Sequence, residues 1–290
     1  MGAPKRIEIV GVPMDLGANR RGVDMGPSAV RYARLEEQLR GMGFEIVDRG
    51  NLSVPDRAAR SQEAERARYV AIVREVCDEL ASTVADIVES GGFPLVLGGD
   101  HSIAMGTLAG IARARGAAPG LVWVDAHADI NSPDTSPSGN VHGMPLHFAL
   151  DTGSVIPDAT VLLGLRDVDP PEKETIRALG VRTYTMSEID RHGIDAVARE
   201  AIAVAAGDGR TIHLSFDMDA IDPREAPGVG TPVKGGLTYR EAHQLLEQIA
   251  ASGRLGSLEI TEINPILDVH NQTATLAVEL ILSALGKTIL

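Results

Sequence analysis

The chain contains very little cysteine and few aromatic residues. One cysteine among 290 residues excludes an internal disulfide framework. Aromatic residues make up only 3% of the sequence, so leucine, valine, isoleucine and alanine must fill the core. A hydrophobic content of 44% gives ample material for that purpose. We interpret the one cysteine, Cys77, as a small buried hydrophobe in a helical stretch.

Positive charge is also scarce. Lysine and arginine number 27 against 40 aspartates and glutamates, which gives a formal net charge of −13. Phosphate binding needs clustered lysine and arginine, so we expect no nucleic-acid partner. The N-terminus lacks the apolar core of a signal peptide, and no apolar run approaches membrane-spanning length. We therefore expect a soluble cytoplasmic protein with no membrane partner.

Apolar, strand-like runs alternate with helical patterns along the whole chain. This alternation predicts an α/β fold with three α/β/α layers, in which helices cover both faces of a mostly parallel sheet. No linker or repeat interrupts the pattern, so we expect a single domain over residues 1–290. The expected strands are 6–10, 45–47, 93–97, 121–124, 161–164, 181–184, 212–216 and 258–260. The expected helices are 27–41, 62–90, 102–113, 195–206, 238–251 and 272–285.

Three acidic motifs directly follow three of these strands. They are Gly-Gly-Asp-His-Ser at 98–102, Asp-Ala-His-Ala-Asp at 125–129 and Ser-Phe-Asp-Met-Asp at 215–219. Ligand sites in parallel α/β sheets lie beyond the carboxyl ends of the strands, where all three motifs fall. Side chains of an extended chain alternate between two faces. We therefore expect the acidic and histidine side chains of each motif to share one face.

Carboxylates gathered in this way repel one another, and a multivalent cation is needed to keep them all ionised. A single motif of this kind would be read as a helix cap or a surface turn, but three with interleaved histidines favour a metal site. Carboxylate and imidazole donors exclude a structural thiolate zinc site and suit manganese or magnesium. The candidate ligands are His101, Asp125, His127, Asp129, Asp217 and Asp219.

Six ligands are too many for one ion that keeps an open position, but they suit two. Two ions about 3.5–4 Å apart can share a water, and metal binding can lower the pKa of a water to near 7. This chemistry favours hydrolysis at a polar carbon centre. Two long loops, 131–143 and 220–236, directly follow metal motifs. Loops of this length are usually functional, so we expect them to form the walls of a substrate pocket.

These motifs, together with others along the chain, resemble the ureohydrolase family and, within it, the arginases. The similarity covers nearly the whole length, and the joint occurrence of the motifs in this order is specific. The further motifs are 22–27, 138–143, 165–170, 230–238 and 262–265. The resemblance implies an arginase-like fold and the binuclear manganese-dependent hydrolysis of L-arginine to L-ornithine and urea by a metal-bridging hydroxide. It also implies a homotrimer or a homohexamer.

The resemblance assigns roles to particular residues. Asp129 would orient the hydroxide, Glu262 would pair with the substrate guanidinium, and His142 would shuttle protons, a role that suits imidazole. Two manganese ions per subunit are implied, with Asp125 and Asp217 as bridges. The first ion would be held by His101, Asp125, Asp129 and Asp217, and the second by Asp125, His127, Asp217 and Asp219.

The loop at 131–140 is expected to recognise the amino-acid head group of the substrate. By resemblance, Asn131 and Ser138 would bond the α-carboxylate and Asp169 would meet the α-ammonium. Glu172 follows Pro171, which stands where glycine is often found in the family. The expected substrate-binding residues are Asn131, Ser136, Ser138, Asn140, Asp169, Glu172 and Thr231.

Three alternatives stay open at this point. Another guanidino or formimino hydrolase, such as agmatinase, guanidinobutyrase or formimidoylglutamase, would be favoured by loss of the head-group loop, which is present. A metal-dependent deacetylase shares the broad fold but uses one zinc. A pseudoenzyme that keeps only the fold would normally have lost a ligand, His142 or Glu262. We interpret the remaining histidines as structural, namely His147, His192, His213, His243 and His270.

Overall fold

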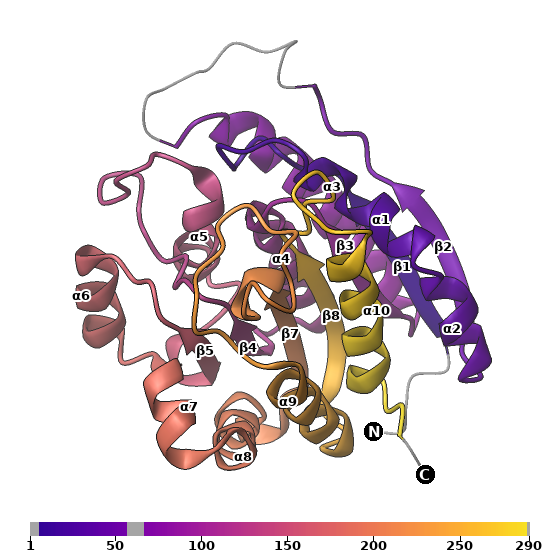
Figure 1. Cartoon of the computed structure of the whole chain (residues 1–290). Coiled ribbons are helices and arrows are strands. Elements are labelled where there is room, and N and C mark those ends of the chain that lie inside the picture. Colours follow the sequence, from indigo (N-terminus) through magenta and orange to yellow (C-terminus); the bar gives the residue numbers. More distant parts are fainter. Residues whose placement is uncertain (1–5, 57–66, 289–290) are drawn as a thin grey trace.

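The computed structural model describes residues 6–56 and 67–288, which form one eight-stranded sheet (Figure 1). The strand order is β2-β1-β3-β8-β7-β4-β5-β6, and every neighbouring pair is parallel. All eight expected strands are confirmed. Their bounds are β1 (Arg6–Val12), β2 (Glu45–Asn51), β3 (Phe93–Gly98), β4 (Gly120–Val124), β5 (Thr160–Leu165), β6 (Arg182–Thr185), β7 (Ile212–Asp217) and β8 (Leu255–Thr261).

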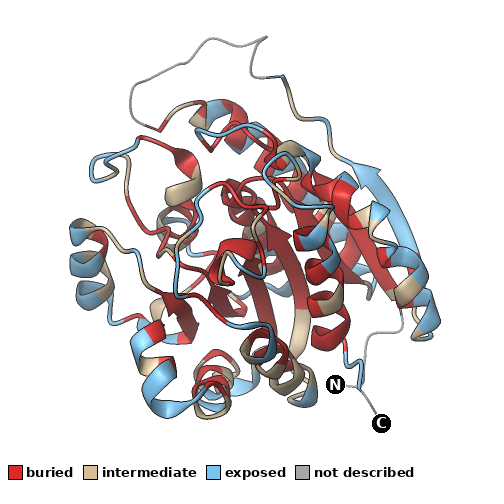
Figure 2. Cartoon of the chain, viewed as in Figure 1, coloured by how far each residue is buried: buried red, intermediate tan, exposed pale blue. Residues whose placement is uncertain are grey.

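Helices cover both faces of the sheet, which confirms the three-layer α/β/α architecture. In β3, Leu95 and Leu97 belong to a hydrophobic cluster with α1, α2 and α7 to α10, whereas Val96 belongs to a cluster with α3. Buried residues run along the central strands and the inner sides of the helices (Figure 2). The helices are α1 (Gly26–Tyr32), α2 (Leu35–Gly41), α3 (Val70–Glu89), α4 (Ala104–Arg115), α5 (Pro145–Asp151), α6 (Pro170–Leu179), α7 (Met186–His192), α8 (Ile194–Ala205), α9 (Tyr239–Ala251) and α10 (Gln272–Ala284).

Several helix predictions were wrong in detail. The single helix expected over 27–41 is two helices, because Arg34 adopts a left-handed backbone with φ 67° between α1 and α2. Within the described residues, the helix expected over 62–90 begins only at Val70, and residues 62–66 lie outside them. Helices α5, α6 and α7 were not predicted, because at 7, 10 and 7 residues they are too short to show a clear helical period.

Cys77 is buried in α3, where burial raises the pKa of its thiol, as expected for a small structural hydrophobe. Among the helices of residues 6–56 and 67–288, none is both long and apolar enough to cross a membrane.

The sheet order places the acidic motifs next to one another. Strands β3, β8, β7 and β4 are consecutive neighbours in the middle of the sheet, although they are far apart in sequence. Because parallel strands end at the same edge, the residues that follow them meet there. The motifs at 98–102, 125–129 and 215–219, together with Glu262, therefore converge at one edge of the sheet.

Candidate metal centre and adjoining cavity

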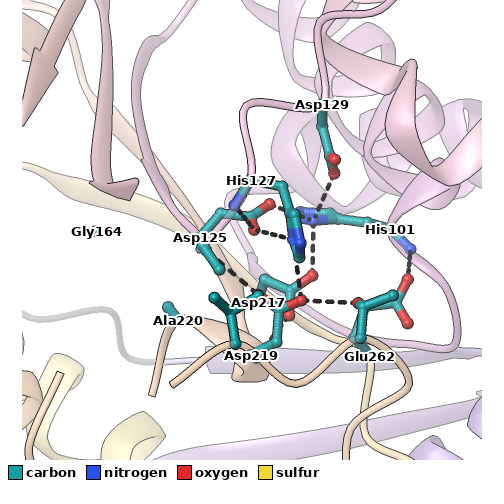
Figure 3. Close-up of polar contacts among 12 residues, drawn as sticks. His101, Asp125, His127, Asp129, Gly164, Asp217, Asp219, Ala220 and Glu262 are labelled. Atoms are coloured by element: carbon teal, nitrogen blue, oxygen red, sulfur yellow. Dashed lines mark hydrogen bonds and ion pairs between the residues drawn. The ribbon is translucent and has the colours of Figure 1, made fainter. Parts of the chain in front are cut away.

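Short turns after the central strands bring the six candidate ligands together (Figure 3). His101 begins a 3-10 helix just after β3, and the Asp100 side chain caps it by accepting from Ser102 N. Asp217 is the last residue of β7, and its carboxylate accepts from Asp219 N at 2.7 Å. The carboxylate of Asp125, after β4, accepts from His127 N at 2.7 Å in the same manner.

The expectation that strand alternation would place the ligands on one face was wrong. Strand β4 ends at Val124, before the first ligand of its motif. Asp129 has a left-handed backbone with φ 51°, and Asp219 lies in a 3-10 helix, Met218–Ala220. The ligands converge because carboxylates fold the chain into turns by accepting backbone N–H groups two residues ahead.

Two groups of side chains share Asp125. His101 Nδ1 lies 3.3 Å from an oxygen of Asp125, 3.3 Å from one of Asp129 and 3.1 Å from one of Asp217. His127 Nδ1 lies 3.3 Å from the other oxygen of Asp125 and 3.1 Å from Asp219 Oδ2. The ligand atoms of His101, Asp125 and Asp217 lie within 4.8 Å of one another, as do those of Asp125, His127 and Asp219.

The electrostatics of this cluster suit bound cations. Burial and the neighbouring carboxylates of Asp219 and Asp125 raise the pKa of Asp217 well above its usual value. Burial and the charge of Asp125 raise the pKa of Asp129 to about 7. His101 Nδ1 is buried and makes no hydrogen bond within the described residues, although carboxylate oxygens surround it. A divalent cation would use this nitrogen as a ligand and would relieve the repulsion between the carboxylates.

An aromatic ring holds two of the ligands in place. The ring of Trp123 stacks on that of His101, with centroids 4.0 Å apart and an angle of 9° between the planes. Its indole Nε1 also donates to Asp125 Oδ2 at 2.9 Å. Trp123 was predicted only as part of the strand at 121–124. Trp123 lies on the opposite face of β4 from Val122 and Val124. Its place two residues before Asp125 could have indicated the hydrogen bond between these two side chains.

Glu262 and His142 form a buried pair beside the cluster. Glu262 Oε1 lies 2.9 Å from His142 Nδ1 and accepts from His101 N at 2.9 Å. Burial alone would lower the pKa of His142, but the Glu262 charge raises it to about 9. Burial raises the pKa of Glu262, but His142 and His101 together lower this pKa more, so that it lies below its usual value. Glu262 Oε2 is buried and makes no hydrogen bond within the described residues.

Two adjoining cavities, of about 210 Å³ and 550 Å³, open onto these side chains. All seven residues expected to bind substrate line one or both of them. The smaller cavity also exposes Asp129, Asp217 and Asp219, and Glu262 borders both cavities. Asp167 borders both as well, and it was not predicted, although it lies in the motif at 165–170. The smaller cavity is lined by Asn131, Ser136, Ser138, Asp169, Glu172 and Thr231, and the larger by Ser138, Asn140 and Thr231.

The walls of the smaller cavity are cross-linked by hydrogen bonds. Asn131 Nδ2 donates to Asp169 Oδ2 at 2.9 Å, and Thr231 Oγ1 donates to Asp219 Oδ2 at 2.9 Å. Glu172 accepts from Ile130 N at 3.1 Å and from Asp169 N at 2.9 Å. The second bond belongs to a capping box at the start of α6, in which Asp169 is the N-cap and Glu172 is the third helical residue. The Glu172 carboxylate therefore holds the turn that contains Pro171, and it lines the smaller cavity.

Known proteins similar to this chain are arginases and their relatives. Residues 5–286 match the model of the Arginase family. The arginase of Bacillus caldovelox is 47% identical over 300 residues, which cover 99% of this chain and 100% of that protein. Its solved structure matches with a TM-score of 0.95 at 46% identity, over 99% of this chain and 100% of that one. A structure described as a hypothetical agmatinase from Burkholderia thailandensis has a TM-score of 0.79 at 28% identity, over 97% of this chain and 84% of that one.

Proposed function

The chain belongs to the arginase family, and from that premise we propose that it hydrolyses L-arginine to L-ornithine and urea with two manganese ions bound. The six converging ligands and the unpaired Glu262 oxygen beside them support this proposal. That oxygen, Oε2, is the observation that carries it. A buried carboxylate oxygen without a partner is costly, and a substrate guanidinium would satisfy it.

The ligand set divides naturally into two sites. His101, Asp125, Asp129 and Asp217 would hold one ion, and Asp125, His127, Asp217 and Asp219 the other. The shared position of Asp125 in both groups of contacts supports its role as a bridge. When bound, the two ions would lower the pKa of a water molecule to near 7 and so supply hydroxide as the nucleophile. Oxygen-rich donors favour manganese over zinc at both positions.

The remaining side chains act on the substrate and on its protons. Glu262 directs the guanidinium carbon toward the metal centre, and the Asp129 carboxylate accepts a hydrogen bond from the attacking water. The water oxygen forms a bond to that carbon, and the bond from the carbon to Nε of arginine then breaks. Nε needs a proton to leave as the amine of ornithine. We assign this delivery to His142, and its hydrogen bond to Glu262 and its position beside both cavities support the assignment.

The head group of arginine would lie against the loop at 131–140. Asn131 and Ser138 offer hydrogen bonds to an α-carboxylate, and Asp169 offers a negative charge to an α-ammonium. Ser136, Asn140 and Thr231 complete these walls. Glu172 acts on the substrate through Asp169, whose backbone N–H it accepts. A site that bonds a head group rejects analogues that lack it by up to about 10⁴–10⁵.

We propose further that residues 1–290 are one domain, as the single sheet supports, and that the protein is cytoplasmic. Three or six copies of the chain would form the assembly. These statements extend the family resemblance and are separate from the chemistry of the site.

Product release after manganese reconstitution tests the proposed function. Urea release is measured from L-arginine, agmatine and guanidinobutyrate, and formamide release from formimidoylglutamate, with and without Mn²⁺. We expect L-arginine to exceed the others by a wide margin in kcat/KM, and only with metal. An equal or higher kcat/KM for agmatine would replace the arginase proposal with agmatinase activity.

A further inference from the structure

Three buried polar side chains lie on the Nε2 side of the His101 ring, and none of them lines the two cavities. Ser215 and His213 are on β7, Glu259 is on β8, and all three are fully buried. The parallel register of the two strands pairs Ser215 with Glu259 and His213 with Ser257. A glutamate in the middle of a buried strand is unusual, because its charge needs a specific partner.

The hydrogen bonds of this group have only one consistent direction. Ser215 Oγ lies 2.7 Å from Glu259 Oε1 and 2.8 Å from His101 Nε2. An ionised carboxylate only accepts, so the single hydroxyl proton of Ser215 goes to Glu259. The Ser215 oxygen must then accept from His101, which requires the proton of that imidazole to be on Nε2.

This tautomer determines what His101 presents to the candidate metal site. With its proton on Nε2, neutral imidazole has a lone pair on Nδ1. His101 Nδ1 is the atom that lies 3.1–3.3 Å from the carboxylates of Asp125, Asp129 and Asp217. A lone pair there can coordinate a cation, whereas an N–H there would exclude it.

His213 lies beside Glu259 on the neighbouring strand. Its Nε2 lies 3.3 Å from Glu259 Oε1, and its Nδ1 lies 2.9 Å from Ser257 Oγ. Burial raises the pKa of Glu259, but His213, together with His101 and Thr107, lowers this pKa more and leaves it below its usual value. The carboxylate is thereby kept in the form that accepts from Ser215.

We propose that Glu259 is a positioning residue that acts through Ser215 to hold the His101 proton on Nε2, so that Nδ1 faces manganese as a ligand. The inference rests on the metal-binding part of the proposed function and is independent of whether arginine is the substrate. We call the hydrogen-bonded series Glu259, Ser215 and His101 the relay, and we assign to His213 a supporting role beside it.

Manganese affinity of the full-length, metal-free protein tests the relay. Glu259→Gln preserves shape but offers Ser215 either a donor or an acceptor, so the direction of the relay is no longer fixed. Ser215→Ala removes the hydroxyl that links the two groups. By titration calorimetry we expect each variant to bind Mn²⁺ at the His101 site about 10–100-fold more weakly than the unmodified protein.

The double variant separates a relay from a merely structural effect. Once Ser215→Ala has cut the link, adding Glu259→Gln should weaken Mn²⁺ binding no further, because coupled residues are not additive. The matched control is Ser283→Ala, which removes the 2.8 Å hydroxyl partner of another histidine, His243, away from the metal ligands. Its Mn²⁺ affinity should equal that of the unmodified protein.

Unchanged Mn²⁺ affinity in Glu259→Gln, with the metal-free Tm retained, would overturn the proposal, and so would additive losses in the double variant. If Glu259→Gln does not fold, Ser215→Ala alone decides, and unchanged affinity in that variant rejects the relay. The two proposals can fail separately. If the unmodified protein binds two Mn²⁺ but releases no urea from arginine, and the variants bind Mn²⁺ more weakly as described, the proposed function is refuted and this inference stands.

Discussion

Replacing Glu262 by glutamine removes a negative charge from the site while preserving its shape. In the unmodified protein, Oε1 accepts from His101 N and lies beside His142, and Oε2 is left for the substrate. The amide retains one acceptor but turns N–H donors toward a cation that has only donors to offer. Guanidinium binding should therefore be lost, whereas the six metal ligands are untouched.

The size of this effect can be worked out from the burial of the pair. Glu262 is 1% exposed, and removing one partner of a buried ion pair costs about 3–5 kcal/mol. At about 1.4 kcal/mol for each factor of ten, kcat/KM for L-arginine should fall by roughly 150- to 5,000-fold. The Glu262 charge is also the largest cause that raises the pKa of His142 to about 9, so this pKa should fall in the variant.

Three measurements test the Glu262→Gln variant. They are urea release at saturating Mn²⁺, manganese content, and NMR titration of His142 in the metal-free protein. The matched control is Glu172→Gln at the cavity wall, whose carboxylate accepts only backbone N–H groups in the described structure. We expect it to cost much less than Glu262→Gln. A kcat/KM within tenfold of the unmodified protein in Glu262→Gln, with two Mn²⁺ bound, would show that the guanidinium docks elsewhere.

Further predictions concern the metal, the head group and acid stability. Asp217→Ala should lose at least one manganese and nearly all turnover, and His101→Asn should lose less of both. Metal analysis and urea release measure these losses, and full turnover in Asp217→Ala would contradict the prediction. Asp169→Ala should weaken arginine hydrolysis but leave agmatine hydrolysis unchanged, so equal losses in kcat/KM would remove Asp169 from head-group binding. Burial raises the pKa of Asp48, but hydrogen bonds from Arg31 and Gly50 lower it more, to below its usual value. Ionised Asp48 therefore stabilises the fold above its unfolded pKa of about 3.9, and this contribution is lost as the pH falls through the folded-state pKa. Asp48→Asn should lower Tm at pH 7 by an amount that shrinks from about pH 5 toward pH 2, and a constant difference in thermal unfolding would refute the assignment.

Strands β3 and β4 could be predicted because each is a short, nearly continuous apolar run, as Phe93–Gly98 illustrates. The acidic motifs at their ends then located the candidate site. The break between α1 and α2 could not be predicted, because Arg34 adopts a left-handed conformation that its side chain does not favour. The start of α6 did carry a signal, since Asp169 and Glu172 have the spacing of a capping box.

The contacts behind the metal ligands depend on how strands are paired. Ser215 and Glu259 are 44 residues apart, and only the register of β7 against β8 brings them into contact. The stacking of Trp123 on His101 likewise joins the end of β3 to β4, which are not neighbours in the sheet. A single sequence contains the residue types for such contacts but not the register that joins them.

Titration of the metal-free protein with Mn²⁺, followed by urea release from L-arginine, tests the central claim most directly. The claim is that two manganese ions held by one shared set of ligands carry out arginine hydrolysis. We expect activity to rise until two equivalents of Mn²⁺ per chain are bound and then to remain constant. Full activity at one equivalent, or no urea release with two equivalents bound, would contradict it.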